Sequence, residues 1–401
     1  MNLHNSTNTL SRRQFLQTTA VTATTAATTA ATTAATTAAT TAATTAATTA
    51  ATTKPKSGPK VRTVLGPVDA SELGVTLMHE HAPAIDWAEL YEIDPAPIDP
   101  VRQHMLDLTV KLLDRFHQTL GTGQGPGAIV ECTPIRVGRY PQLLVELARK
   151  TPIHVIACTG FWCEAMAPQH PWALELGRKK NADKKIADLY IREITEGMED
   201  PHGEWGQRFT TVPVGIIKCA TSSHLRPSER VCHIAAAIAS NETGCPITTH
   251  TTDGGGLEEA QLFLKHRTTP SKIIIGHQGN LDDRTESESH EYHRRLVGMG
   301  CNVQFDRIGH AEKYGNTKIA RLVKPLVDSG HVRQIFFSHD NGPYFNNDYT
   351  GAKGTGQDWK ITHSDYTVVT TGLVIAMKEL GITDKQIQTM LVENPQRILA
   401  F

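Results

Sequence analysis

Six side chains with metal-binding atoms stand at or just after the ends of short apolar runs. They are His79 and His81 in GVTLMHEHAP, Lys218 in GIIKCAT, His250 in TTHT, His277 in IIGHQG and Asp340 in FFSHD. Residues two positions apart on a strand point to the same face, so His79 and His81 share one side. Imidazole nitrogens and carboxylate oxygens are ligands of zinc and related divalent ions. A single histidine at a strand end is more often structural, but six such groups together predict a metal centre.

The lysine of this set is the most specific residue. In PVGIIKCAT, alternation along a strand places Val214, Ile216 and Lys218 on one side, which we expect to face the interior of a barrel. An unpaired ammonium is costly to bury. A neutral amine can instead add carbon dioxide and become a carbamate, whose two oxygens can bridge two cations. The alternatives are a lysine that reaches the barrel mouth and one that pairs with Asp340.

Eight short apolar runs alternate with longer amphipathic segments, and this alternation predicts a (β/α)8 TIM barrel of the α/β class. The runs cover residues 74–81, 127–134, 154–160, 212–221, 246–251, 272–279, 301–306 and 334–340. Gly244 is expected to cap one intervening helix, and Thr383 with Gln386 to form a capping box at the start of another. Catalytic residues of such barrels lie at the carboxyl ends of the strands, where the six metal-binding side chains occur.

The amino-terminal segment has a different composition. SRRQFLQ places Arg12 and Arg13 before an apolar pair, no charged residue follows until Lys54, and residues 23–53 repeat Ala-Ala-Thr-Thr. The arginine pair resembles a twin-arginine export signal, and a repeat without large side chains cannot build a core. We therefore expect residues 1–58 to be a signal and linker, residues 59–401 a single barrel domain, and the mature protein periplasmic or extracellular. The alternatives are a cytoplasmic location and a membrane anchor, although alanine and threonine partition too weakly into lipid for stable insertion.

The overall composition favours a small-molecule partner. Forty Lys and Arg residues face 41 Asp and Glu residues, so the chain lacks the basic surface that a nucleic-acid-binding protein needs. The seven cysteines are an odd number, and several occur within apolar runs. This pattern indicates buried thiols rather than a disulfide framework.

With the six residues in place, the chain resembles the phosphotriesterase family of the amidohydrolase superfamily. The resemblance spans residues 60–401 and rests on these segments: GVTLMHEH, GIIKCAT, TTHT, IIGHQG, FDRIG, FSHDNGPY and LVENPQRIL. It implies that His79, His81 and Asp340 hold a buried metal ion, that His250 and His277 hold a more exposed one, and that carboxylated Lys218 bridges the two. Zinc suits these ligands, and cobalt, manganese or iron could occupy them as well.

Two metal ions that share one water imply hydrolysis. The shared water loses a proton near neutral pH and becomes a bridging hydroxide, while the exposed metal ion polarises a carbonyl or phosphoryl oxygen. Asp340 would then be both a metal ligand and a proton acceptor.

Departures from the resemblance bear on the substrate. Arg307 in FDRIG stands where the organophosphate-hydrolysing branch carries a histidine, and it resembles the lactonase-like branch; Asn280 stands where an aspartate often occurs. Arg307 is expected to bind substrate or, alternatively, to pair with Asp306. Phe161 and Trp162 are expected to form an aromatic wall for the substrate or, alternatively, to be core residues. The Gly- and Asn-rich segment 341–367 is expected to overhang the site.

The leading hypothesis is a binuclear-metal hydrolase of lactones or carboxylic esters with a weaker phosphotriesterase activity, in which Asp340 and Arg307 act catalytically. The first alternative is a dedicated organophosphate triesterase. The second is a non-catalytic barrel that binds a ligand, for which loss of metal ligands would be expected. A homodimer is left open.

Overall fold

The computed structural model describes residues 58–83, 99–135, 138–162, 179–201, 206–252, 254–279, 281, 284–309, 315–343 and 365–401. The expected export signal, the Ala/Thr repeat, Asn280 and most of segment 341–367 lie outside these residues, so the expectations for them stay predictions. The described residues belong to one compact unit, Lys56–Phe401. Among them, no helix is both long enough and apolar enough to cross a membrane.

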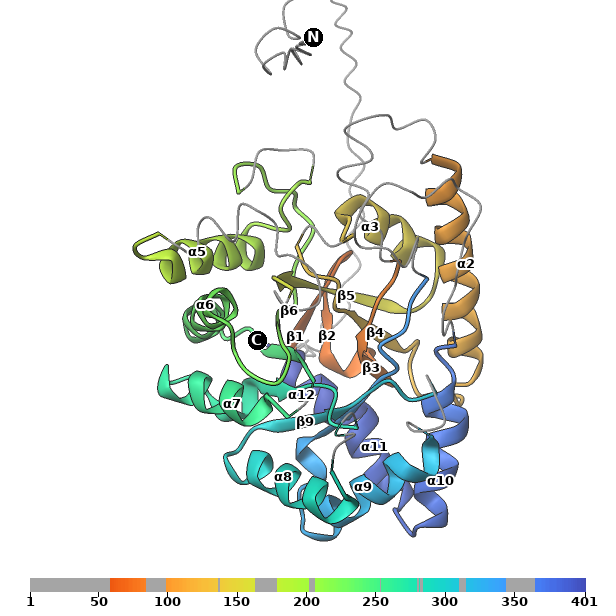
Figure 1. Cartoon of the computed structure of the whole chain (residues 1–401). Coiled ribbons are helices and arrows are strands. Elements are labelled where there is room, and N and C mark those ends of the chain that lie inside the picture. The colour runs from red at the N-terminus through yellow and green to blue at the C-terminus, as the bar shows by residue number, and fades with distance from the viewer. Residues whose placement is uncertain are drawn as a thin grey trace, which may run out of the picture. The chain divides into compact units, whose positions relative to one another are not determined.

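Eight parallel strands form a nearly closed barrel, which confirms the predicted (β/α)8 fold (Figure 1). In chain order they are β3 (Thr76–Glu80), β4 (Ala128–Glu131), β5 (His154–Gly160), β6 (Ile216–Thr221), β7 (Ile247–Thr251), β8 (Ile273–Ile275), β9 (Asn302–Phe305) and β10 (Ile335–Phe337). Each strand pairs with the next one in the sequence, and each lies within one of the eight apolar runs.

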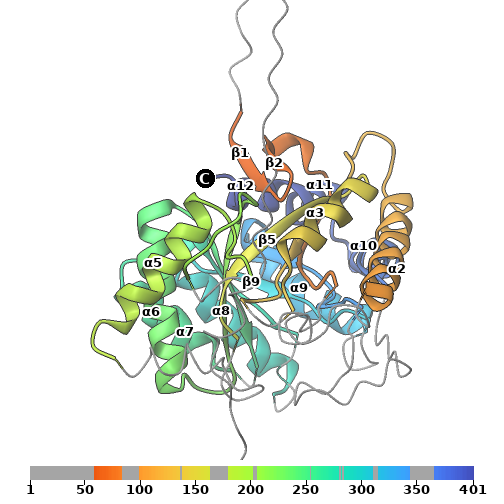
Figure 2. The same ribbon diagram turned by 90° about the horizontal axis from the view of Figure 1, so that it is seen from above.

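Helices surround the strands, as Figure 2 shows from a second direction. They are α2 (Asp99–Gln118), α3 (Pro141–Lys150), α5 (Ala182–Thr195), α6 (Pro227–Thr243), α7 (Gly256–Lys265), α8 (Glu286–Gly298), α9 (Asn316–Asp328), α10 (Val374–Glu379), α11 (Asp384–Gln388) and α12 (Asn394–Leu399), with π-helical turns η5 (Val369–Leu373) and η6 (Thr389–Glu393). Gly244 ends α6 at φ 76°, and Thr383 with Gln386 forms the expected capping box of α11.

The barrel has two apolar layers, and they correct one detail of the sequence interpretation. Ile216 packs inside the barrel with Ile274 and Phe336, whereas its neighbour Ile217 packs outward against the helices. Val214 also packs in the outer layer, because it precedes the first residue of β6. The alternation that directs Lys218 inward therefore begins at Ile216 and not at Val214.

A short hairpin before the barrel was not expected from the sequence. Strands β1 (Lys60–Thr63) and β2 (Gly66–Asp69) pair antiparallel, and Val61 bridges to Ala400 near the carboxyl terminus. Val61 is fully buried in the inner layer. Four-residue strands that contain lysine, arginine, glycine and proline give almost no periodic hydrophobic pattern. The hairpin is held in place by its contact with the last residues of the chain, which no sequence pattern reveals.

The six described cysteines are buried and free of disulfides, as expected. Burial raises the pKa of the Cys158 and Cys219 thiols well above the usual value, so these groups stay neutral. They act as small apolar side chains.

A buried carboxylate joins the first and last strands of the barrel. β3 and β10 are the two ends of the hydrogen-bonded strand order. Glu80 of β3 is fully buried, and its Oε1 accepts hydrogen bonds from Ser338 Oγ (2.8 Å), His339 N (2.9 Å) and His339 Nδ1 (2.8 Å). Its Oε2 accepts one from Asn341 N at 2.9 Å. Glu80 thus closes the barrel by side-chain bonds.

Replacing Glu80 by glutamine should destabilise the protein by about 2–4 kcal/mol, because the amide faces the Asn341 N–H and the charge of the acceptor is lost. Chemical denaturation followed by circular dichroism measures this change. The matched control is Glu286→Gln, which removes a surface ion pair with Arg321 and should cost less than about 1 kcal/mol. Equal stability of the two variants would show that Glu80 does not close the barrel.

Candidate metal centre

The six side chains singled out in the sequence converge at the carboxyl ends of five strands. His79 lies in β3 and His81 directly follows it; Lys218 lies in β6 and His250 in β7, while His277 follows β8 and Asp340 follows β10. Their side chains are buried, except that the Asp340 side chain keeps 11% of its surface exposed. Strands far apart in the sequence therefore bring all six groups to one end of the barrel.

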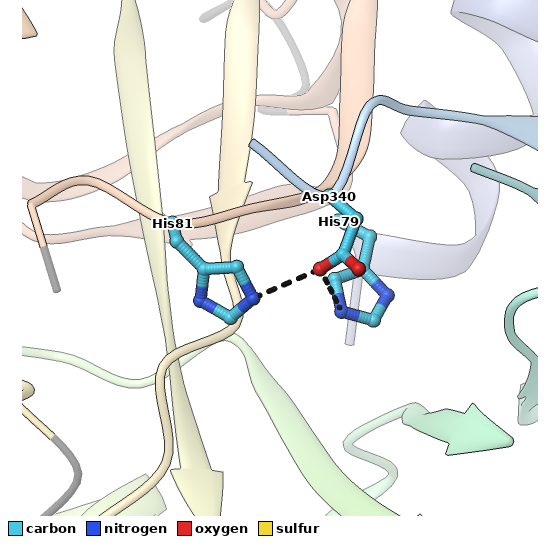
Figure 3. A group of neighbouring side chains, drawn as sticks. All are labelled: His79, His81 and Asp340. Atoms are coloured by element: carbon cyan, nitrogen blue, oxygen red, sulfur yellow. Dashed lines mark hydrogen bonds and ion pairs between the residues drawn. The ribbon is translucent and has the colours of Figure 1, made fainter. Parts of the chain in front are cut away.

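Asp340 lies between the imidazoles of the first strand (Figure 3). Its Oδ1 is 3.1 Å from His81 Nε2 and 3.5 Å from His79 Nε2. These three residues offer ligand atoms that all lie within 4.8 Å of one another. They form the first candidate metal-binding group.

The remaining ligand atoms face this group. Lys218 Nζ lies 2.5 Å from His79 Nε2, and His277 Nε2 lies 2.6 Å from His250 Nδ1. The second Asp340 oxygen, Oδ2, is 3.8 Å from His277 Nε2. Asp340 thus contacts His79 and His81 through Oδ1 and His277 through Oδ2.

Asp306 contacts the far side of two imidazoles, a role that the sequence interpretation missed. Its Oδ1 is 2.5 Å from His277 Nδ1, and its Oδ2 is 3.4 Å from His79 Nδ1. Oδ2 also accepts hydrogen bonds from His277 N (3.2 Å) and Gln304 Nε2 (2.7 Å). His79, His277 and Asp306 are geometrically a second possible ligand group. We assign Asp306 to positioning: it accepts the Nδ1 proton of His277 and so turns the Nε2 lone pair toward the centre, and it holds Gln304, whose Nε2 lies 3.0 Å from His79 Nδ1.

The pKa values of the site suit metal binding. Burial and the charge of Lys218 lower the pKa of His79 to about 3, and burial with the charges of His277 and Arg307 lowers that of His250 well below its usual value. Burial alone would raise the pKa of Asp340, but the neighbouring histidines and Arg307 hold it well below the usual range. Neutral imidazoles and an ionised carboxylate are the forms that coordinate a cation, so the residues present fit divalent metal ions.

Three residues at the site adopt a left-handed backbone conformation. His277, Arg307 and Asp340 have φ values of 57°, 59° and 57°, and they follow strands β8, β9 and β10. Non-glycine residues rarely adopt this conformation, which costs of order 1–3 kcal/mol each when the surroundings impose it. The hydrogen bonds of His277 to Asp306 and of Asp340 N to His79 O (2.9 Å) oppose that cost.

Arg307 and the two aromatic residues lie in different surroundings. Arg307 Nε contacts Asp340 Oδ2 at 3.0 Å, so Arg307 is joined to the centre, while Asp306 holds the imidazoles.

Trp162 is half-buried and packs edge-on against His250, with ring centroids 4.5 Å apart. Phe161 points the other way into the core against Tyr190, with 2% of its surface exposed. Of the two alternatives for Phe161, the structure favours the core position, and its contribution to a substrate wall stays a prediction.

The sequence of the whole barrel matches one family. The model of the phosphotriesterase family matches residues 59–399. The chain belongs to this family. Its members use a binuclear divalent metal centre, and the chain is accordingly a metal-dependent hydrolase that acts on small molecules.

Proteins similar to this chain are named for different activities. The chain is 29% identical to a phosphotriesterase homology protein of Mycobacterium tuberculosis, covering 85% of this chain and 97% of the relative. It is 26% identical to an aryldialkylphosphatase of Saccharolobus solfataricus, covering 83% and 97%. A solved structure of a mutant PTE-like lactonase from Deinococcus radiodurans is 27% identical and covers 84% of this chain and 99% of that one, with a TM-score of 0.69.

Replacing Asp306 by asparagine should weaken metal binding about 10- to 100-fold, because the two imidazoles lose the acceptor that orients them. Competition with a chelator, followed by elemental analysis, measures the loss. Asp328→Asn, which removes an exposed ion pair with Lys324, is the control and should bind metal normally. If the Asp306 variant retains its metal as tightly as the control, the positioning role is wrong.

Proposed function

We propose that the chain hydrolyses lactones or carboxylic esters and cleaves phosphotriesters more weakly at the same site. The observation that carries this proposal is the contact between Arg307 and Asp340 at the edge of the centre. The Arg307 side chain is 18% exposed and makes a 3.0 Å bond to Asp340. A guanidinium there can donate hydrogen bonds to the oxygens of an acyl group. The lactonase among the similar structures supports the same substrate class.

The ligands divide into two sets in this proposal. His79, His81 and Asp340 would hold one divalent ion, His250 and His277 would hold the other, and Lys218 would join the two sets. Lys218 would act as a carbamate, formed when its neutral amine bonds to the carbon of carbon dioxide and releases a proton to solvent. When bound, two metal ions supply Lewis-acid activation of water and of the substrate oxygen. Zinc suits this mixture of nitrogen and oxygen ligands, and cobalt, manganese and iron are alternatives.

Asp340 then moves the proton during hydrolysis. The oxygen of the attacking water bonds to the carbonyl carbon, and its proton passes to the Asp340 carboxylate. The bond from the acyl carbon to the alkoxide breaks, and the alkoxide takes up that proton. The low pKa of Asp340 keeps the carboxylate ionised before the reaction, and it also favours return of the proton to the alkoxide. Arg307 holds the carboxylate oxygen Oδ2, and Trp162 offers an apolar face beside His250 for the acyl chain or leaving group.

A dedicated organophosphate triesterase is the second candidate, and the aryldialkylphosphatase among the relatives favours it. A non-catalytic barrel is the weakest alternative. Proteins of that kind are expected to lose ligands, whereas all six expected ligand residues are present and lie together.

The Lys218→Ala variant should lose one or both metal ions and most of its hydrolytic activity, because no anionic group then joins the two ligand sets. Elemental analysis of the purified variant measures the metal content. A short carboxylic acid such as propionate, added in solution, should restore part of the activity by taking the place of the carbamate. Lys324→Ala is the surface control. Two tightly bound metal ions and normal turnover in the Lys218 variant would exclude the bridging role.

The Arg307→His variant distinguishes the two enzymatic candidates. Loss of a charge-assisted hydrogen bond should lower kcat/KM for a lactone about 10- to 100-fold, whereas kcat/KM for an aryl phosphotriester should fall less or rise. Steady-state kinetics on one substrate of each kind, with thermal denaturation alongside, measures both. Equal losses with unchanged stability would remove Arg307 from substrate choice, and equal losses with a lower Tm would indicate a structural role.

A further inference from the structure

A surface hollow lined in part by two arginines lies at the opposite end of the barrel from the candidate metal centre. Its volume is about 310 Å³, and its lining includes Ser271, Gly298, Asn302, Arg333, Gln334 and Arg397. Ser271 and Gln334 come just before β8 and β10, and Asn302 begins β9. The metal-binding residues instead lie at or beyond the carboxyl ends of parallel strands, so the two sites occupy different faces.

Four backbone carbonyls at or beside this hollow already accept hydrogen bonds from side-chain amides. Gln334 Nε2 donates hydrogen bonds to Val297 O (2.8 Å) and Cys301 O (2.7 Å). Asn302 Nδ2 donates to Ser271 O (3.0 Å) and Ile273 O (2.8 Å). A cation in the hollow would find its carbonyl ligands engaged by these two amides.

The donors, in contrast, are not all used. Arg397 Nη2 donates to Arg333 O at 2.7 Å, but its Nε–H is buried and has no acceptor in the described part of the chain. Arg333 is exposed and forms no ion pair with an acid of the described segments. Glu393 lies one turn before Arg397, but its Oε2 accepts a hydrogen bond from Thr389 Oγ1 at 3.0 Å.

The two arginines also repel each other. Burial and the positive charge of Arg333 both lower the pKa of Arg397. Like charges held together without an acid are unfavourable, and an anion between them would remove that cost. The hollow therefore has an excess of positive charge, because both arginines line it and neither forms an ion pair with an acid of the described residues.

We propose that this hollow binds a phosphate group through Arg333 and Arg397, at a site separate from the hydrolytic centre. A guanidinium presents its N–H groups as a planar fork that matches the oxygens of phosphate, and two of them balance a doubly charged anion. The cavity is larger than a bare phosphate ion needs, so it can hold either the free ion or a small phosphorylated molecule.

Isothermal titration of inorganic phosphate into the full-length, metal-loaded protein at constant ionic strength tests this site. Phosphate can also bind at the metal centre, but that site is the same in every variant. The wild type should bind one more phosphate per chain than Arg333→Gln or Arg397→Gln, or bind it at least about tenfold more tightly. Arg321→Gln removes the same charge from an exposed ion pair with Glu286 and should behave like the wild type.

Unchanged phosphate binding in both pocket variants would overturn the proposal, and so would an equal loss in the Arg321 control, which would indicate general charge attraction. Lower stability without a change in phosphate binding would also overturn the proposal and would mean that the arginines only stabilise the fold. If Arg397→Gln does not fold, Arg333→Gln decides, because its side chain is exposed. Tighter binding of a small alkyl phosphate than of inorganic phosphate would identify a phosphorylated molecule as the ligand, and equal binding would identify the free ion.

Discussion

The buried carboxylate of Glu80 is the constraint on which the active end of the barrel depends. It lies between His79 and His81 in the sequence, and its two oxygens accept hydrogen bonds from the segment Ser338–Asn341. Asp340 belongs to that segment, so the same bonds that close the barrel also set the position of Asp340 relative to the two histidines. A barrel joined by backbone hydrogen bonds alone would fix the strands but would fix the Asp340 side chain less firmly.

The same connection extends to the helices near the carboxyl terminus. His339 donates from Nδ1 to Glu80 and accepts at Nε2 from Val369 N, at 3.0 Å. Tyr366 donates its hydroxyl hydrogen to His81 O at 2.8 Å. The start of η5 is therefore fixed to the metal-binding strand, and the stability of the fold and the geometry of the site rest on one set of bonds.

The two ends of the barrel differ in backbone strain and in the charged groups that they hold. At the carboxyl ends of β8, β9 and β10, three left-handed residues hold polar side chains around the centre, and Asp306 orients two imidazoles from behind. At the amino ends, amides of Asn302 and Gln334 satisfy backbone carbonyls and leave the arginines as spare donors. Backbone strain and buried charge at one end contrast, at the other, with two arginines that form no ion pair within the described residues.

The sequence by itself determined the eight strands, the capping of α6 and α11, and the six candidate ligands, because strand periodicity, caps and ligand residue types are local signals. Only the tertiary structure decided the hairpin β1–β2, the role of Asp306 and the core position of Phe161. Each of these depends on contacts between segments far apart in the chain: Val61 with Ala400, Asp306 with His79, and Phe161 with Tyr190. Such contacts leave no local pattern, because the partner of a side chain is fixed by how the strands pack and not by its neighbours in the sequence.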